Sequence, residues 1–518
     1  MKSKYYVTTP IYYPNGAPHI GHAYTTIACD VMARFKRLDG FDVLFITGTD
    51  EHGQKMAKAA EAAGMAPLDF AAKMSAQFQA MGPVIGASTD DFVRTTKARH
   101  TAASKEIWRR MMAAGDIYLG GYAGWYAVRD EAFYDEEEIT TAADGTKAGP
   151  SGAPVEWVTE SSYFFRLSAF QDRLLAYYEA HPEFIAPTSR RNEVVSFVKS
   201  GLRDLSVSRT SFSWGVEVPG NAAHVMYVWV DALTTYLTAT GFPDASADRA
   251  GFWPADMHMV GKDILRFHAV YWPAFLMSAG IPLPKRIYAH GWWTVGGEKM
   301  SKSLGNTVDP LEMTETFGID AVRFFLLRET PFGSDGTISR AALVGRLNSE
   351  LANDLGNLAQ RSLSLIARNC DGRLPGQGTR TEADNALLAA ADALVRSVRA
   401  CLERQAFGEA LEEVWKVIRA ANGYIDHQAP WALRRTDAAR MADVLRLLVD
   451  ALRVIATVLQ PFMPGSMARM LDQLGAPVDA RDLVSLLVPL AGGTQLPAPA
   501  GVFPRFVEKE GEGAALDS

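Results

Sequence analysis

The stretch YYVTTPIYYPNGAPHIGHAYT (residues 5–25) joins a strand-like run to a helix-like run through a turn that holds two histidines. Its first residues, YYVTT (5–9), are all β-branched or aromatic, and a helical pattern covers residues 23–38. The apolar run DVLFIT (42–47) is typical of a buried parallel strand, and the loop GTDEHG (48–53) follows it. Strand, turn, helix and strand in this order predict a doubly wound parallel sheet, in which ligands bind beyond the carboxyl ends of the strands.

The composition is that of an ordinary globular protein with several domains. A chain of 518 residues, 48% hydrophobic and 21% charged, is long enough for about two to four domains. The net charge of −7 argues against a protein that coats nucleic acid, although it does not exclude a local basic surface. Three widely spaced cysteines, Cys29, Cys370 and Cys401, imply no disulfide framework.

We expect neither a signal peptide nor a membrane span. The first residues lack a long apolar segment, and no apolar run reaches the ~18 residues that a spanning helix needs. The richest apolar stretch, residues 443–465, carries charges at helical spacing and is typical of an amphipathic helix. The sequence therefore predicts a cytoplasmic protein without a membrane partner.

The pattern along the chain predicts an α/β fold: a Rossmann-like doubly wound parallel sheet, split by a connective insertion and followed by an all-α helical bundle. The expected segments are the first half of the Rossmann-like domain (1–115), the insertion (116–223), the second half of the domain (224–339), the helical bundle (340–507) and a disordered polar tail (508–518). In the bundle, Leu347, Leu351, Leu355 and Leu358 follow one face of a helix.

The turn PNGAPHIGH (14–22) is the first candidate site. His19 and His22 are three residues apart at the start of a helix, so they lie on one side of it. Gly21 leaves room for a ligand against the backbone. Two imidazoles at the positive end of a helix could stabilise negative charge on a phosphate. The alternative is a helix-capping turn with incidental histidines, and a metal site is less favoured because no third ligand is near.

The loop GGEKMSKSLGN (296–306) is the second candidate site. Lys299 and Lys302 lie between glycines and serines, and two ammonium groups on such a loop could close over a polyphosphate. The alternative is a solvated surface loop. Neither the P-loop pattern nor the dinucleotide-binding glycine pattern occurs anywhere in the chain.

Together, HIGH at 19–22 and KMSKS at 299–303 resemble the signature pair of the class I aminoacyl-tRNA synthetases. Further stretches resemble the methionyl-tRNA synthetase family over about residues 4–435. They are GTDEHGQK, GWYAVRDEAFY, SYFFRLS, GLRDLSVSR, YVWVDAL, GKDILRFH and APWAL, together with the opening stretch. The stretches YVWVDA and GKDILRFH are the most discriminating.

The resemblance implies a set of site residues. Catalytic roles fall on His19, His22, Lys299 and Lys302, and ATP contacts on His19, Gly21, His22, Gly261, Asp263, Trp293 (through its backbone) and Lys302. The methionine pocket would be lined by Ile11, Tyr13, Trp229, Ala232, Tyr236, Phe267 and His268. Asp50 would bind the ammonium group of methionine. Aromatic rings suit a thioether, since sulfur–aromatic contacts are favourable. Taken alone, the aromatic residues could be core residues and the two aspartates could be helix caps.

The helical region resembles the family's anticodon-binding bundle. Asn357, Arg361 and Trp431 match its anticodon-reading positions, although a tryptophan after a proline is often a packing residue. The implied partners are L-methionine and tRNA(Met), both initiator and elongator, with the CAU anticodon. Because the chain ends soon after this region, we expect a monomer.

The implied cofactors are ATP and Mg²⁺. Many members of the family also carry zinc knuckles with paired cysteines in the insertion. The matching positions here are Ala127, Asp130, Ala148 and Ser151. Since none is a cysteine, we expect no structural zinc and a loop that other contacts hold.

The implied reaction has two steps. Methionine and MgATP give methionyl-adenylate and pyrophosphate, and the methionyl group then passes to the 3′-terminal adenosine of the tRNA. Three alternatives remain: another class I synthetase, for cysteine, leucine or valine; a nucleotidylyltransferase with a related histidine signature; and a non-catalytic RNA-binding descendant. The insertion is short for an editing domain, zinc-binding thiols are missing, and both signatures are intact, which favours the methionine enzyme.

Overall fold

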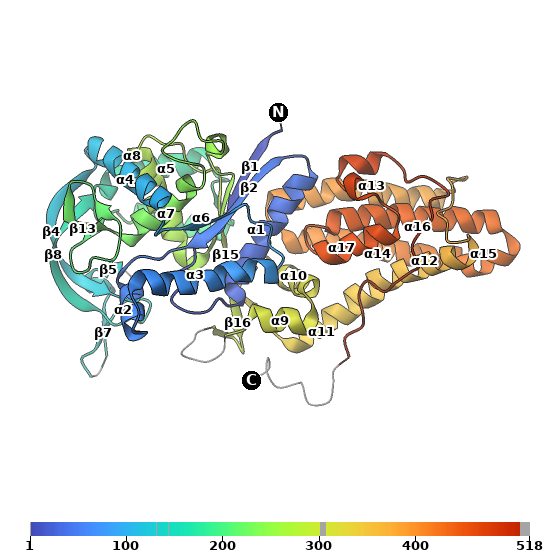
Figure 1. The fold of residues 1–518 in the computed structure, drawn as a ribbon, viewed down its shortest axis with the longest axis horizontal. Coiled ribbons are helices and arrows are strands. Elements are labelled where there is room, and N and C mark those ends of the chain that lie inside the picture. The colour runs from blue at the N-terminus through green and yellow to red at the C-terminus, as the bar shows by residue number, and fades with distance from the viewer. Residues whose placement is uncertain (1, 131, 143, 301–306, 508–518) are drawn as a thin grey trace.

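The computed structural model describes residues 2–130, 132–142, 144–300 and 307–507. An α/β part and an elongated helical part lie side by side along the long axis of the molecule (Figure 1). The expected tail at 508–518 lies outside the described residues.

A six-stranded parallel sheet forms the centre of the α/β part, in the order β3-β2-β1-β14-β15-β9. Its strands are β1 (Lys4–Thr8), β2 (Asp42–Thr49), β3 (Asp91–Arg94), β9 (Ile185–Ala186), β14 (Met257–Gly261) and β15 (Ile287–His290). Strands β2 and β3 lie on one side of β1, and strands β14, β15 and β9 lie on its other side. This reversal of the strand order creates a crevice at the carboxyl ends of β1 and β14, where ligands bind in such sheets. The predicted doubly wound sheet is confirmed.

Helices cover the sheet. They are α1 (Ile20–Leu38), α2 (Gln54–Ala62), α3 (Pro67–Val84), α4 (Ala98–Ala113), α7 (Val228–Thr238), the π-helical segment η5 (Phe267–Tyr271) and α8 (Trp272–Ser278). Helix α1 begins at Ile20, three residues before the helical pattern of the sequence, because His19 caps it. Most apolar positions of α1 are buried, and Ile27 and Val31 are fully buried.

The insertion is built mainly of antiparallel strands. One sheet has the order β10-β8-β4-β5 and another the order β11-β13-β12. The elements are β4 (Ile117–Ala127), β5 (Ala132–Tyr134), β6 (Thr140–Thr141), β7 (Lys147–Ala148), β8 (Glu156–Phe165), α5 (Gln171–Ala180), α6 (Thr188–Lys199), β10 (Leu205–Ser206), β11 (Ser208–Arg209), β12 (Glu217–Val218) and β13 (Asn221–Met226). Strand β9 also comes from this stretch, yet it pairs with β15 at the edge of the central sheet. The sequence pattern did not predict this edge strand, which has only two residues.

The helical part begins after the short strands β16 (Trp293–Val295) and β17 (Glu298–Lys299), and β18 (Gly336–Thr337) pairs with β16. Its helices are α9 (Pro310–Phe317), α10 (Ile319–Arg328), α11 (Arg340–Arg346), the π-helical η6 (Leu347–Gly356), α12 (Asn357–Asn369), α13 (Glu382–Glu403), α14 (Phe407–Gln428), α15 (Pro430–Thr436), α16 (Ala438–Leu459) and α17 (Pro464–Gln473). Short 3₁₀ turns are η1 (Glu136–Glu138), η2 (Leu167–Phe170), η3 (Ala250–Phe252), η4 (Lys262–Ile264), η7 (Val478–Ala480) and η8 (Val484–Leu487). All four leucines of the predicted apolar face are buried.

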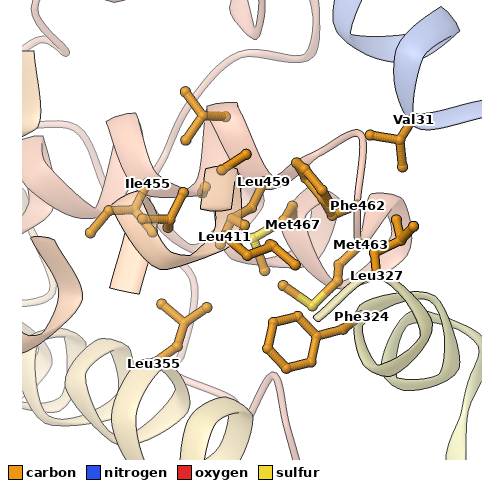
Figure 2. Close-up of a cluster of buried hydrophobic side chains, with 14 of the residues drawn as sticks. Val31, Phe324, Leu327, Leu355, Leu411, Ile455, Leu459, Phe462, Met463 and Met467 are labelled. Carbon is orange, nitrogen blue, oxygen red and sulfur yellow. The ribbon is translucent and has the colours of Figure 1, made fainter. Parts of the chain in front are cut away.

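The two parts share one hydrophobic core. Val31 of α1 and Phe324 of α10 lie beside Leu411, Leu459 and other apolar side chains of the bundle (Figure 2). This shared core fixes the direction in which the bundle extends from the α/β part.

A buried ion pair crosses the same interface. The guanidinium of Arg323 on α10 donates to Asp30 Oδ2 of α1 at 2.7 Å, and both side chains are fully buried. The guanidinium also donates to the main-chain oxygens of Pro461 (2.6 Å), Phe462 (2.9 Å) and Ile85 (3.0 Å). One side chain therefore connects α1, α10 and the bundle.

Within the described ranges, no helix is both long and apolar enough to cross a membrane.

Candidate active site

A cavity of about 400 Å³ lies at the carboxyl ends of β1, β14 and β15, since Pro10, Gly261 and His290 line it. Its wall includes every predicted ATP-binding residue that the structure describes: His19, Gly21, His22, Gly261, Asp263 and Trp293. It also includes the predicted methionine-binding residues Ile11, Tyr13, Asp50, Trp229, Ala232, Tyr236 and His268. Two groups of residues that lie far apart in the sequence therefore meet around one space.

Phe267 lines a neighbouring cavity of about 1620 Å³ instead. Its ring stacks on Trp229, with the ring centroids 3.8 Å apart and the planes at 7°. Phe267 thus packs against Trp229, which lines the smaller cavity.

His19 and His22 cap α1. His19 Nδ1 accepts from the Gly21 main-chain N–H, and His22 Nδ1 accepts from the His19 N–H, both at 3.1 Å. The two rings lie 3.8 Å apart between centroids. Because Nδ1 is the acceptor in each ring, a neutral imidazole carries its proton on Nε2. The turn therefore caps the helix, and the two rings, which line the cavity, carry their N–H on Nε2.

Two glycines of the cavity leave room for the side chains of neighbouring site residues. A Cβ at Gly21 would lie 2.9 Å from His19 Cε1, and a Cβ at Gly261 would lie 2.6 Å from Asp263 Oδ1. A side chain at either position would displace a predicted ATP-binding group.

The end of the cavity near Tyr236 holds neutral, mostly aromatic groups. His268 Nδ1 donates to the Ile264 main-chain oxygen at 2.9 Å, so its Nε2 accepts from the Tyr236 hydroxyl at 2.6 Å. Burial lowers the pKa of His268 to about 4, and burial raises the pKa of Tyr236 well above its ordinary value. Both groups are therefore uncharged near neutral pH, which suits an apolar ligand.

Asp50 supplies a carboxylate at the edge of this neutral end. It follows β2 directly and is 7% exposed. Its main-chain N–H donates to the Tyr12 oxygen at 2.9 Å. A carboxylate at this place can pair with a substrate ammonium group.

The opposite end contains residues that the sequence did not single out. Trp292 Nε1 donates to Asp263 Oδ1 at 3.2 Å. The main-chain N–H of Trp292 and the ammonium of Lys262 both donate to Asp335, each at 2.8 Å to Oδ1. His290, which ends β15, contacts Thr25 Oγ1 through Nε2 at 2.7 Å. The sequence signal for His290 was its place at the end of a predicted strand, in a chain with only ten histidines.

The larger cavity connects the site to the insertion. It shares Tyr13, Asp50, Trp229 and Asp263 with the smaller cavity, and it extends to Arg129, Asp130, Tyr134 and Ser151 of the insertion. A ligand longer than the smaller cavity can therefore extend towards the insertion.

Polar contacts join Asp130 and Ser151, two of the four insertion positions that the sequence comparison with the family singled out. Asp130 accepts from Tyr134 at 2.9 Å and from the Ser151 hydroxyl, and Arg129 donates to Ser151 Oγ at 2.8 Å. Ala127 is buried. Over the part of the chain that the structure describes, no group of three or more histidine, cysteine, aspartate or glutamate residues is arranged to hold a metal ion.

The described start of the lysine loop lies at the site: it forms β17, and Met300 lines the smaller cavity. This strand pairs antiparallel with β16, whose first residue, Trp293, lines the cavity. Lys302 lies outside the described residues, and so does the side chain of Lys299. Their predicted roles stay predictions.

Two of the three predicted anticodon residues are in contact on the bundle. The Arg361 guanidinium lies 5.2 Å from the centre of the Trp431 ring and donates to Asp426 at 2.6 Å. Asn357 is exposed one turn before Arg361 on α12, and Trp431 is 41% exposed on α15. An exposed indole beside a guanidinium is a surface on which unpaired bases can stack.

Comparisons with known proteins show the family to which the chain is similar. A family described as "tRNA synthetases class I (M)" matches residues 5–363, and one described as "Anticodon binding domain of methionyl tRNA ligase" matches residues 374–515. The methionine–tRNA ligase of Brucella melitensis is 58% identical over 510 residues, which cover 98% of this chain and 99% of that protein.

Two solved structures are also similar. Mycobacterium tuberculosis methionyl-tRNA synthetase in complex with methionyl-adenylate has 56% identity and a TM-score of 0.95, over 97% of this chain and 100% of that chain. Its apo form has 52% identity and a TM-score of 0.90, over 98% and 99%. The chain therefore belongs to the methionyl-tRNA synthetase family of class I aminoacyl-tRNA synthetases, and as a member it is an ATP-dependent ligase that joins methionine to tRNA.

Proposed function

We propose that the cavity binds L-methionine and MgATP side by side and forms methionyl-adenylate. The methionine carboxylate attacks the α-phosphorus of ATP, and pyrophosphate leaves. His19 and His22 donate through Nε2–H to the phosphate oxygens, where negative charge develops in the transition state. The observation that carries this assignment is the helix cap, which uses Nδ1 of both rings and so fixes the tautomer.

The neutral end of the cavity selects the amino acid. Trp229, Tyr236 and His268 contact the thioether side chain, and Ile11, Tyr13 and Ala232 complete the pocket. Phe267 supports Trp229 by stacking on its ring. Asp50 pairs with the ammonium group. Because Tyr236 and His268 stay uncharged, a charged side chain would enter without a partner, and this disfavours polar amino acids.

The adenosine end selects the nucleotide. Asp263 accepts from the ribose hydroxyls, Gly261 leaves space for the ribose, and the Trp293 backbone contacts the base. Lys299 and Lys302 neutralise the leaving pyrophosphate. Mg²⁺ arrives with ATP, since a hard cation is held mainly by phosphate oxygens and water in such complexes.

The second step passes the methionyl group to the 2′-hydroxyl of the 3′-terminal adenosine. The larger cavity between the site and the insertion supports an approach of the tRNA end from that side. Asn357, Arg361 and Trp431 read the CAU anticodon, which initiator and elongator tRNA(Met) share. We infer a cytoplasmic monomer in which 1–115 and 224–339 catalyse, 116–223 contacts the acceptor end and 340–507 binds the anticodon.

Amino-acid-dependent exchange between ATP and pyrophosphate tests the first step. We expect exchange with methionine alone among the twenty amino acids, without tRNA, since the pocket is neutral and aromatic. Exchange with another amino acid would keep the adenylate chemistry and overturn the assignment of the pocket. No exchange with any would overturn tRNA-independent activation.

Replacing Trp431 by alanine tests the anticodon assignment. We expect kcat/KM for tRNA(Met) to fall by about fivefold to 150-fold, because one base-stacking platform contributes roughly 1–3 kcal/mol. The rate of ATP–pyrophosphate exchange should not change, since Trp431 lies on the bundle, away from the cavity. Leu487→Ala, which shortens another exposed apolar side chain of the same part, is the matched control and should leave both rates unchanged. Equal loss in both variants would contradict the assignment.

A further inference from the structure

A buried carboxylate and two histidines lie behind the methionine end of the cavity. Asp231 Oδ2 contacts His52 Nδ1 and Asp231 Oδ1 contacts His100 Nε2, both at 2.6 Å. The exposed fractions are 1% for Asp231, 7% for His52 and 0% for His100. The chemistry proposed above uses none of these three groups.

The three residues come from three different elements. Asp231 lies on α7, His52 lies in the loop after β2, and His100 lies on α4. Each oxygen of one carboxylate therefore contacts a different segment, and the three segments are held against one another.

The contact between Asp231 and His52 lies next to the predicted ammonium site at Asp50. His52 is two residues beyond Asp50, and its main-chain oxygen accepts from the Tyr13 hydroxyl at 2.9 Å. The Trp214 indole N–H donates to the Glu51 main-chain oxygen at 2.7 Å, and its ring meets His52 edge to face. Tyr13 and Trp214 thus both form hydrogen bonds to the loop that carries Asp50, and His52 connects this loop to α7.

The same carboxylate belongs to the helix that lines the thioether end. Asp231 is two residues after Trp229 and directly before Ala232, and both of these line the cavity. His100 of α4 also contacts Thr238 Oγ1 of α7 at 2.9 Å, so α4 contacts α7 at two side chains, Asp231 and Thr238. The distance between Asp50 and Trp229 therefore depends on Asp231.

The electrostatics favour a charged pair. Burial alone would raise the pKa of Asp231, but the His52 and His100 rings outweigh burial and hold it below the usual carboxyl value. Burial also opposes protonation of His52, yet Asp231 outweighs it and raises the pKa of His52 above its ordinary value. A buried pair of this kind restrains geometry, because neither group has water as an alternative partner.

We propose that Asp231 is a positioning residue for methionine: through His52 it holds Asp50 at the separation from Trp229 and Ala232 that the ammonium group and side chain of the substrate require. This proposal rests on the assignment of the pocket to methionine. Asp231 itself does not line the smaller cavity, so its effect on the substrate is indirect.

The test measures KM for methionine and for ATP separately, by ATP–pyrophosphate exchange with the full chain. For Asp231→Asn we expect KM for methionine to rise by about tenfold to a hundredfold, because a small displacement of a binding group causes a loss of this size. KM for ATP should stay within about threefold of its value in the unchanged chain. His52→Ala should act in the same way. His52→Asn keeps an N–H donor where Nδ1 stands, and should return KM for methionine to within about threefold of the unchanged chain.

The matched control is Asp384→Asn. Asp384 is 1% exposed, and it pairs with Arg440 at 2.6 Å and with Tyr424 at 2.7 Å in the helical part. Its loss should lower the thermal midpoint without changing KM for methionine, as a purely structural role predicts.

The outcomes are distinct. A parallel rise of KM for both substrates, or an Asp231→Asn variant that only loses thermal stability as Asp384→Asn does, would overturn the positioning role. If Asp231→Asn does not fold, the two His52 variants decide, and equal KM values for both would overturn the proposal. Failure of the unchanged chain to exchange with methionine would instead overturn the function on which the proposal rests.

Discussion

His22→Asn is expected to lower the single-turnover rate of methionyl-adenylate formation by about a hundredfold to a thousandfold, the usual loss for one donor to a developing oxyanion. Asparagine can keep an acceptor where Nδ1 of His22 accepts from the His19 N–H, but it offers nothing at the position of Nε2. The helix cap should therefore persist while the phosphate loses a donor. Rapid-quench measurement of adenylate formation gives the rate directly.

Methionine affinity and the thermal midpoint are the controls for this variant. Tryptophan fluorescence can follow methionine binding, since Trp229 lines the pocket, and we expect the affinity to be unchanged. His22→Ala removes the cap as well as the donor, so it should lose the same rate and some stability in addition. A rate for His22→Asn close to that of the unchanged chain would show that the histidine acts only as a cap.

Arg323→Met is expected to destabilise the chain by about 3–5 kcal/mol, the usual result of leaving one member of a buried ion pair without its partner. Asp30 would stay buried without the guanidinium, and the oxygens of Pro461, Phe462 and Ile85 would lose their donor. Urea denaturation followed by circular dichroism measures the loss. Arg404→Gln, which removes an arginine from an exposed pair with Glu409, should shift the midpoint little.

The loss should also depend on pH. Burial would raise the pKa of Asp30, but Arg323 and Arg34 outweigh it and hold the pKa below the ordinary value of 3.8. A depressed carboxyl pKa stabilises the fold above the unfolded value, and this contribution disappears as the pH falls through the folded value. We therefore expect the difference between Arg323→Met and the unchanged chain to be constant from about pH 8 to pH 5 and to shrink below about pH 4. A difference independent of pH would contradict the role of the charge.

The sequence by itself predicted the features that depend on residues close together in the chain. The alternation of strands and helices predicted the doubly wound sheet, because burial patterns of periods 2 and 3.6 are local properties. The turn at His19–His22 was also accessible, since a helix cap spans only three residues. Its two interpretations, cap and phosphate site, are compatible, because they use different nitrogens of the same rings.

Tertiary structure alone decided which distant residues meet. Asp231 and His52 are separated by 179 positions, and Arg323 and Asp30 by 293, yet each pair is buried in contact. Strand β9 has two residues and no pattern of its own, and it joins the central sheet only because β15 offers it an open edge. Such contacts depend on how whole elements pack, and packing depends on shape and volume, which no local pattern encodes. Sequence therefore determined the family, the sheet and the signature turn, while packing decided the surroundings that hold the methionine pocket in place.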